Sequence, residues 1–391
     1  MPDHPRDRAI LDAASTRMHP VARETLLAAV DAGWADPRRL YAEARTARRL
    51  LDQATEVIAD GLGVRASELA FAPSGEAAVR RAVAGALHSA RRRGARVVAT
   101  AVEHSAVLAP GRYRAAQGHD DALFAEVPVD HEGRVDLTAL AAAVRVEGTV
   151  AAAVQHANGE VGTLQPLAEA HAECRAAGVP LVVDAQASLG RSRPPAHFDV
   201  LAGDAQSWGG PGGVGVLVVP ERTRWALPGP AGEPGHGRGG DLPWVPLALA
   251  AAEAWQQGAA ALDREGADAT ALVDDIRRCA AGVRDVEVVG HPTARLPHIV
   301  TFSALYCDGE AVVHELDRRG FAVASGSACT ASTLEPSHVL AAMGVLTHGN
   351  VRVTLPLAAV SPGRADDVAR FCTALPEVIA DVRAQLGVER L

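Results

Sequence analysis

The chain has 391 residues, 48% of them hydrophobic, which is enough for a core shared by two joined domains. Its net charge of −9, with no basic stripe, argues against nucleic-acid binding. The charged N-terminus has no apolar signal stretch and no run of about eighteen apolar residues occurs, so we expect neither secretion nor membrane spanning. The cysteines are odd in number and form no Cys-x-x-Cys pair, which predicts reduced thiols in the cytoplasm, without disulfides or zinc, at Cys174, Cys279, Cys307, Cys329 and Cys372.

The first part of the chain alternates helical and strand patterns. Apolar residues recur at threes and fours over 21–32 and 41–62, which predicts two helices. Short, continuous apolar runs predict strands at 69–72, 96–100, 150–154, 180–183 and 215–219. Because such strands alternate with helices, they predict a mostly parallel sheet with helices on both faces.

The second part has a different order of elements. Residues 229–240 are rich in Gly and Pro and predict a loop. Two long helices are expected over 247–257 and 260–280. From about residue 285 the patterns run strand, strand, helix, strand, loop, helix, strand and helix, which predicts a smaller α+β unit.

One cysteine, Cys329, lies within a run of Ser, Gly, Ala and Thr at 324–340. Small residues predict an accessible loop, where a thiol can react. An incidental thiol in a surface loop is the alternative, since a lone cysteine is usually a small hydrophobic residue. The whole stretch resembles the catalytic loop of the cysteine desulfurases of the NifS/IscS type. In those enzymes the loop cysteine attacks a cysteine–pyridoxal phosphate adduct and leaves as a persulfide, so the resemblance implies a sulfur-carrying role for Cys329.

The resemblance extends over roughly residues 8–385. It implies the fold-type I fold of pyridoxal-phosphate-dependent transferases, as in the class V aminotransferases. This is an α/β fold whose mostly parallel sheet is covered by helices, with a smaller α+β C-terminal domain. The expected division is an N-terminal segment 1–20 that packs on the small domain, a large α/β domain of the cofactor-binding type at 21–258, and a small α+β domain at 259–391 that carries Cys329.

Several site residues of the family have matches here. In Glu103-His104-Ser105, the resemblance places His104 against the pyridine ring. In 156–162 it places Asn158 beside the cofactor. Asp184, at the end of a strand, would hold the pyridinium nitrogen protonated, and Arg352 would bind the substrate carboxylate. The alternatives are a helix-start histidine bonded locally for His104 and a turn residue for Asp184.

The lysine that binds the cofactor has no match. Counting back from Gly210-Pro211, its position holds Ser207, preceded by Gln206 in place of the family's histidine. No lysine occurs anywhere in the chain, because all 38 basic residues are arginine. The family's lysine both holds the cofactor and carries a proton, and a serine hydroxyl does neither at neutral pH.

Other positions in the same pocket also differ. The glutamine that bonds the ring hydroxyl aligns with Ala187, and Gln186, one position early, is expected to face the opposite side of the chain. The family's threonine at the start of the phosphate-binding helix aligns with Glu76. The family's threonine that reaches the site from the partner subunit aligns with Asp241. Two carboxylates would repel a phosphate dianion. We therefore expect no cofactor, although the resemblance by itself implies pyridoxal phosphate.

Three hypotheses remain open, and with them whether the chain is an enzyme. The first is a sulfur-transfer protein that has lost the pyridoxal chemistry and carries sulfur on Cys329. Its partners would be sulfur donor and acceptor proteins, and it would form a homodimer or pair with an active desulfurase. The second is a working cysteine desulfurase with pyridoxal phosphate held non-covalently. The third is a pseudoenzyme or a rebuilt pocket for another small molecule. The complete loop at 325–340 favours the first.

Overall fold

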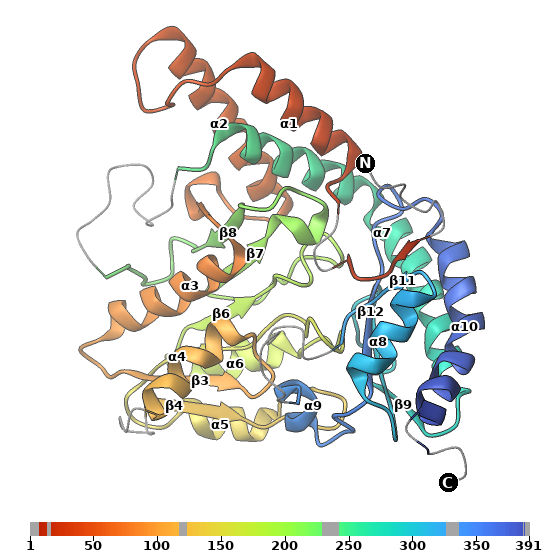
Figure 1. The fold of residues 1–391 in the computed structure, drawn as a ribbon. Coiled ribbons are helices and arrows are strands. Elements are labelled where there is room, and N and C mark those ends of the chain that lie inside the picture. Colours follow the sequence, from red (N-terminus) through yellow and green to blue (C-terminus); the bar gives the residue numbers. More distant parts are fainter. Residues whose placement is uncertain are drawn as a thin grey trace.

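The computed structural model describes residues 8–13, 17–116, 123–228, 242–325, 336–385 and 387. Figure 1 shows a large sheet with its helices and, on the right, a smaller unit formed mainly by the C-terminal part of the chain. The helices are α1 (Pro20–Ala32), α2 (Ala42–Gly61), α3 (Gly75–Ala90), α4 (Ser105–Ala116), α5 (Leu137–Val144), α6 (Leu167–Ala176), α7 (Val245–Ala281), α8 (Gly309–Arg318), α9 (His338–Met343) and α10 (Arg364–Gln385), with the 3-10 helices η2 (Ala66–Glu68) and η4 (Ala205–Trp208).

The large sheet is mostly parallel, as predicted. Within the described ranges it has seven strands in the order β2-β8-β7-β6-β5-β3-β4, and only β8 runs antiparallel to its neighbours. Its strands are β2 (Leu69–Ala72), β3 (Arg96–Thr100), β4 (Phe124–Val127), β5 (Thr149–Ala153), β6 (Leu181–Asp184), β7 (Val200–Asp204) and β8 (Gly215–Val218). The parallel strands β5, β6 and β7 all end at the same edge, which is where this fold places ligands.

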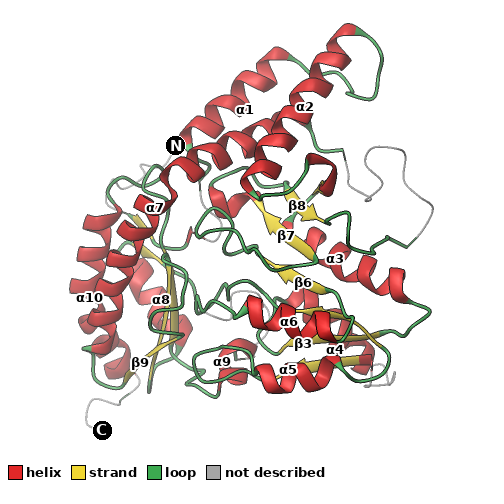
Figure 2. Cartoon of the chain, turned by 180° about the vertical axis from the view of Figure 1, so that it is seen from behind, coloured by secondary structure: helices red, strands yellow, loops and turns green. Residues whose placement is uncertain are grey.

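Both faces of this sheet are covered, which explains why strands such as β2 and β8 are buried and free of polar side chains along their whole length, whereas the edge strand β4 includes the exposed Glu126. Successive side chains of a strand point to opposite faces, so Val98 packs in one cluster while Val97 and Ala99 pack in another. The first cluster includes residues of α2, α5, α6 and α7, and the second includes residues of α3 and α4. In Figure 2 the yellow strands lie between these helices.

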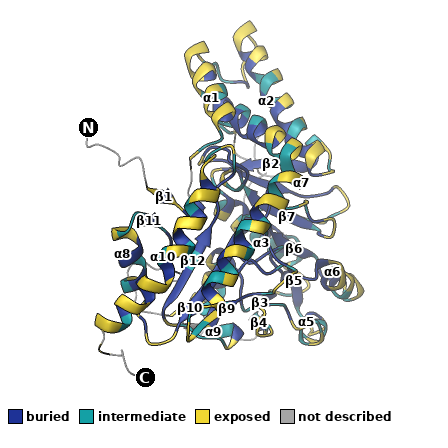
Figure 3. Cartoon of the chain, turned by 90° about the vertical axis from the view of Figure 1, so that its right-hand side faces the viewer, coloured by how far each residue is buried: buried dark blue, intermediate teal, exposed yellow. Residues whose placement is uncertain are grey.

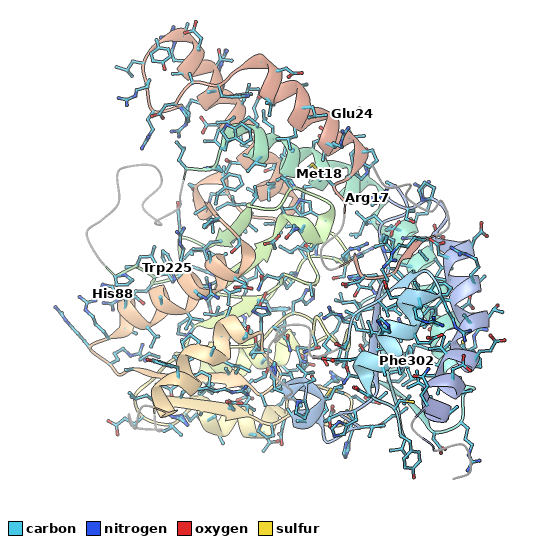
Figure 4. All side chains as sticks on the ribbon, viewed as in Figure 1. Arg17, Met18, Glu24, His88, Trp225 and Phe302 are labelled. Carbon is cyan, nitrogen blue, oxygen red and sulfur yellow. The ribbon has the colours of Figure 1, made fainter. Side chains whose placement is uncertain are left out.

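The smaller unit is built on an antiparallel sheet. β10 (Ile299–Ala304) lies between β9 (Val286–Val289) and β12 (Asn350–Thr354). Phe302, labelled in Figure 4, is fully buried in the core that α7, α8 and α10 complete. β1 (Ala9–Ile10) pairs in parallel with β11 (Phe321–Ala322), so the start of the described chain lies against this unit.

The two helices expected between residues 247 and 280 are one helix. α7 runs without interruption from Val245 to Ala281 and packs against α1, α2 and α10. The gap between the two predicted ranges holds Gly258, but one glycine costs a helix only about 1 kcal/mol relative to alanine. Buried residues on both sides of it, such as Trp255 and Ala269, hold the helix together. The expected domain boundary at 258/259 falls inside α7 and stays a prediction.

No helix in the described part of the chain is long and apolar enough to cross a membrane.

Candidate active site

Polar residues gather where the parallel strands of the large sheet end. Asn158 follows β5, Asp184 is the last residue of β6, and Asp204 is the last residue of β7. The first turn of α3, with Gly75 and Glu76, meets them because Gly75 bonds directly to Asp204. The structure therefore brings together Asp184, Gln186, Glu76, Gln206 and Ser207, which the sequence had placed in one pocket.

Asp184 is buried, and Gln186 holds its carboxylate. The backbone N–H of Gln186 donates to Oδ1 and its Nε2 donates to Oδ2, both at 2.9 Å. Burial raises the pKa of Asp184, while nearby His104 and the bonds from Gln186 counteract this rise. β6 ends at Asp184 and Gln186 lies in the turn that follows it. That Gln186 faces the opposite side of the chain from Ala187 stays a prediction.

Asp204 is a site residue that the sequence analysis missed. Its Oδ2 accepts the backbone N–H of Gly75 at 2.6 Å, at the first residue of α3, and its Oδ1 accepts the N–H of Gln206 at 2.9 Å. The approach requires glycine, because a Cβ on Gly75 would lie 2.4 Å from Gln186 Oε1 and 2.7 Å from Asp204 Cβ. The sequence feature that could have pointed to Asp204 is its position at the end of a short apolar run that forms a strand, the same feature that pointed to Asp184.

A second carboxylate stands on the same turn. Glu76 is in the first turn of α3, where its Oε2 accepts from Arg80 Nη2 at 2.8 Å, and its side chain is about half exposed. Burial raises the pKa of Asp204, and the negative charge of Glu76 adds to the rise. Ser74 caps the helix by accepting the N–H of Ala77 at 3.1 Å. The N-terminus of α3, usually favourable to anions, thus already carries two carboxylates of the protein.

Ser207 lies in η4 with its hydroxyl turned to the backbone. Its Oγ is 2.8 Å from the carbonyl oxygens of both Leu189 and Asp204, and these are the bonds it makes within the described residues. The hydroxyl proton is therefore donated to a carbonyl oxygen. Gln206, beside it, is exposed. Nothing in this arrangement activates Ser207 as a base or nucleophile.

Asn158 and His104 are bonded to nearby backbone. Asn158 Nδ2 donates to Val102 O at 3.1 Å, and its Oδ1 accepts the N–H groups of Glu160 and Val161 at 2.8 Å. His104 Nδ1 accepts the N–H of Ala106 at 3.1 Å, which is the local bond that the structural alternative predicted. The charge interaction of His104 with Asp184 places the imidazole in the same pocket.

Glu103, next to His104, is fully buried. Its Oε1 accepts from Thr100 Oγ1 and from the backbone N–H of Gln155, both at 2.7 Å. Its Oε2 makes no hydrogen bond with any described residue. Burial raises the pKa of Glu103 to about 8, and the charge of Asp184 contributes to the rise. Glu103 is therefore mostly protonated at neutral pH. The sequence analysis gave this residue no role, because nothing in the sequence around it indicates that its side chain is buried.

Arg352 lies in β12, beside the residues that come just before the segment with Cys329. Cys329 and Asp241 themselves lie outside the described residues. Arg352 and Ala324 exchange two backbone hydrogen bonds of 2.7 and 3.1 Å, just before that segment begins. The guanidinium Nη2 is 3.8 Å from Asp12 Oδ1, and its Nε has no hydrogen bond within the described residues.

The C-terminal flank of residues 326–335 also lies near Arg352. The hydroxyl of Ser337 bonds the carboxylate of Glu160, whose charge interacts with Arg352. Burial nonetheless raises the pKa of Glu160 to about 7. Ser337 also caps α9 by accepting the N–H of Leu340 at 3.2 Å. Both flanks of residues 326–335 are thus fixed beside Arg352 and Glu160.

Comparisons with known proteins agree on the family. The family described as Aminotransferase class-V matches residues 10–233 and 246–362. The chain is 35% identical over 391 residues to the IscS-like cysteine desulfurase of Mycobacterium tuberculosis, covering 96% of this chain and 97% of the relative. It is 30% identical over 354 residues to the cysteine desulfurase IscS of Dictyoglomus turgidum, covering 88% of each chain.

Solved structures agree on the fold. A NifS-like protein superposes with a TM-score of 0.84 at 22% identity, covering 96% of this chain and all of that one. The apo structure of a cysteine desulfurase from Thermococcus onnurineus NA1 gives a TM-score of 0.77 at 20% identity, covering 96% of this chain and 95% of that one. The chain belongs to the class V aminotransferase family and, within it, to the IscS-type cysteine desulfurases.

Proposed function

We propose that this chain is a sulfur-transfer protein in which Cys329 carries sulfur as a persulfide and the pyridoxal phosphate chemistry of the family has been lost. Its membership among cysteine desulfurases supports sulfur transfer. One observation is the main support for the loss of the pyridoxal phosphate chemistry. The position matched to the family's lysine holds Ser207, whose hydroxyl is bonded to two backbone carbonyls, in a chain that has no lysine.

The pocket's electrostatics support the same inference. A phosphate at the N-terminus of α3 would need the Gly75 N–H, which already donates to Asp204. It would also face the carboxylates of Asp204 and Glu76, a repulsion on the order of several kcal/mol in a partly desolvated site. These residues do not fit pyridoxal phosphate. His104, Asn158 and Asp184, kept from the family's pocket, then serve the packing of this edge of the sheet.

The chemistry that remains is exchange of sulfane sulfur. The thiolate of Cys329 attacks the outer sulfur of a donor persulfide, R–S–SH, so that a new S–S bond forms on Cys329. The donor's S–S bond breaks and R–S⁻ leaves, so one sulfur atom moves without net oxidation. An acceptor thiolate would remove that sulfur by the same step in reverse. The Nε of Arg352, close to the root of the loop, would bind a carboxylate of the donor.

Loading of Cys329 is tested by mass. The reduced protein is incubated with a small persulfide donor and digested, and the peptides are examined for a gain of one sulfur atom. We expect the gain on Cys329 and its loss in Cys329→Ser, whereas Cys174, which is fully buried, stays unmodified. Loading spread equally over the other cysteines, or no loading, would contradict the carrier role.

Loss of the cofactor is tested by absorbance. Pyridoxal phosphate and then cysteine are added to the purified protein, and the visible spectrum and released sulfide are followed. We expect neither a bound chromophore nor sulfide above the level given by free cofactor. A chromophore together with sulfide release would instead make the chain a working desulfurase with non-covalent cofactor.

We further propose that the chain works in the cytoplasm as a homodimer or paired with an active desulfurase, and that this partner or another persulfide protein loads it. The wide spacing of the cysteines in the sequence, without a Cys-x-x-Cys pair, supports a reducing compartment. Co-purification from native cells distinguishes the two pairings. A lysine-bearing homologue should be recovered if the chain forms a mixed pair, and only the chain itself if it forms a homodimer.

A further inference from the structure

Two cysteines meet in the smaller unit, away from the site described above. Cys279 lies near the end of α7 and Cys372 lies in α10, 93 residues further along the chain. The Sγ of Cys279 donates to the carbonyl oxygen of Cys372 at 3.2 Å. The two thiols also hydrogen-bond to each other. From the bond lengths of the backbone, Cys279 Sγ lies within about 6 Å of the Cα of Cys372.

The helices hold the two thiols in place. Ile276 and Ala280 of α7 are fully buried in the same core as Phe371 and Leu375 of α10. The two cysteines lie at the margin of this core and keep part of their surface open to solvent. Their encounter therefore follows from the packing of α7 on α10 and does not depend on a mobile loop.

The other described cysteines have different surroundings. Cys174 is fully buried, and burial raises its pKa to about 12. Cys307 is 6% exposed, and burial raises its pKa as well. Within the described part of the chain, a thiol that is both accessible and next to a second thiol occurs only at Cys279 and Cys372. This combination is what thiol–disulfide exchange needs.

We propose that Cys279 and Cys372 form a redox-active dithiol that reacts with small disulfides of the glutathione type and closes into a disulfide linking α7 to α10. The proposal concerns a site separate from Cys329 and does not depend on the sulfur-carrier role.

The order of attack follows from the contact between the thiols. The hydrogen bond from Cys372 lowers the pKa of Cys279, and the same contact raises the pKa of Cys372. The thiolate of Cys279 attacks the small disulfide R–S–S–R, a Cys279–S–S–R bond forms, and one R–S⁻ leaves. The thiol of Cys372 loses its proton to solvent and attacks Cys279 Sγ, and the second R–S⁻ leaves. Two protein thiols are oxidised and one small disulfide is reduced.

The disulfide between Cys279 and Cys372 should raise the melting temperature of the protein. It would close a long loop between residues 279 and 372, and such a cross-link restricts the unfolded chain. Oxidised protein should therefore melt several degrees above reduced protein, and dithiothreitol should reverse the shift.

The experiment uses the full chain with Cys329→Ser, so that the loop thiol gives no adduct. The reduced protein is treated with glutathione disulfide, denatured, alkylated and mapped by mass spectrometry. We expect a Cys279–Cys372 cross-linked peptide and two fewer alkylated cysteines. Cys372→Ser should trap glutathione on Cys279, Cys279→Ser should leave Cys372 largely unmodified, and Cys307→Ser should behave like its parent.

The difference between the two single variants is the decisive result. Stable glutathione adducts on both cysteines without a cross-link, or no reaction at either, would overturn the proposal. Equal trapping by the two single variants would overturn the assigned order of attack.

Discussion

Three carboxyl groups lie at the carboxyl edge of the large sheet: those of Glu103 and Asp184 are buried, and that of Asp204 is partly exposed. Burial raises the pKa of each, because a charged carboxylate loses its water on burial, and the charge of His104 offsets this rise only in part at Glu103 and Asp184. Hydrogen bonds from Thr100, Gln155 and Gly75 only partly offset this effect. The stability of the fold should therefore depend on pH through these groups.

Glu103→Gln should flatten this dependence. Glu103 has a pKa of about 8 in the fold against 4.5 in its ordinary state, so between these values the folded chain keeps a proton that the unfolded chain has lost. Stability then falls as pH rises from about 5 to 8, by about 2–4 kcal/mol from this group alone. The amide does not titrate, so the variant loses this slope while bearing a cost of about 1–3 kcal/mol at every pH for an unpaired N–H.

Urea unfolding of both proteins at pH 5, 6, 7 and 8 measures the effect. Only the difference between the two curves is read, because His156, whose pKa burial lowers to about 4, and Glu160 add their own slopes to both. Parallel curves would show that Glu103 is ionised in the folded protein at neutral pH.

Asp204 should block the cofactor even when a lysine is supplied. In Ser207→Lys the amine would be present, but the Gly75 N–H would still donate to Asp204. The double variant Ser207→Lys/Asp204→Ser frees that donor and removes one negative charge. We expect it to bind pyridoxal phosphate on the order of tenfold or more tightly than Ser207→Lys, as measured by absorbance titration. Asp204→Ser alone is the control. Equal affinities of Ser207→Lys and Ser207→Lys/Asp204→Ser for pyridoxal phosphate would mean that Asp204 does not block binding at the N-terminus of α3.

At the scale of elements, β2, β3, β5, β6 and β8 of the large sheet were predicted from the sequence, whereas β4 and β7 were not, and the side chains at the strand ends were predicted less well. The runs at 69–72, 96–100 and 215–219 match β2, β3 and β8 within one residue, because a strand buried on both faces is apolar throughout. Asp204 was missed because its role arises from its contact with Gly75, which lies 129 residues away in sequence.

η4, which carries Ser207, is held in place by α7 through Trp208. The indole is fully buried, its Nε1 donates to Ala251 O at 3.0 Å, and its ring meets Trp255 edge to face at 5.1 Å. Trp208→Ala should cost about 3–5 kcal/mol of unfolding free energy, through the cavity it leaves. Trp208→Phe keeps most of the packing and should cost less.

Chemical denaturation of both variants beside Trp244→Ala tests this. Trp244 is 52% exposed, so its removal should change stability by about 0.5 kcal/mol or less. A loss in Trp208→Ala no larger than that in Trp244→Ala would mean that α7 does not hold η4 through this side chain.

At the scale of the whole molecule, α1 and α2 project beyond the large sheet in Figure 1, and much of α1 is exposed in Figure 3. Leu27 and Val30, three residues apart on one side of α1, are 46% and 43% exposed. Val21, at the start of the same helix, is 36% exposed. Apolar side chains grouped in this way favour burial against another surface.

We expect that surface to be a second copy of the chain, with α1 in the interface. Light scattering should then give twice the 40.5 kDa of one chain. Leu27→Glu/Val30→Glu would place charges in a desolvated contact and should shift the mass to that of one chain at micromolar concentration. Val146→Glu is the matched control, because Val146 is 47% exposed and lies two residues after α5. In Figure 1, α5 is at the opposite end of the molecule from α1. A wild-type chain that is monomeric, or a dimer that withstands the α1 charges, would show that α1 does not mediate self-association.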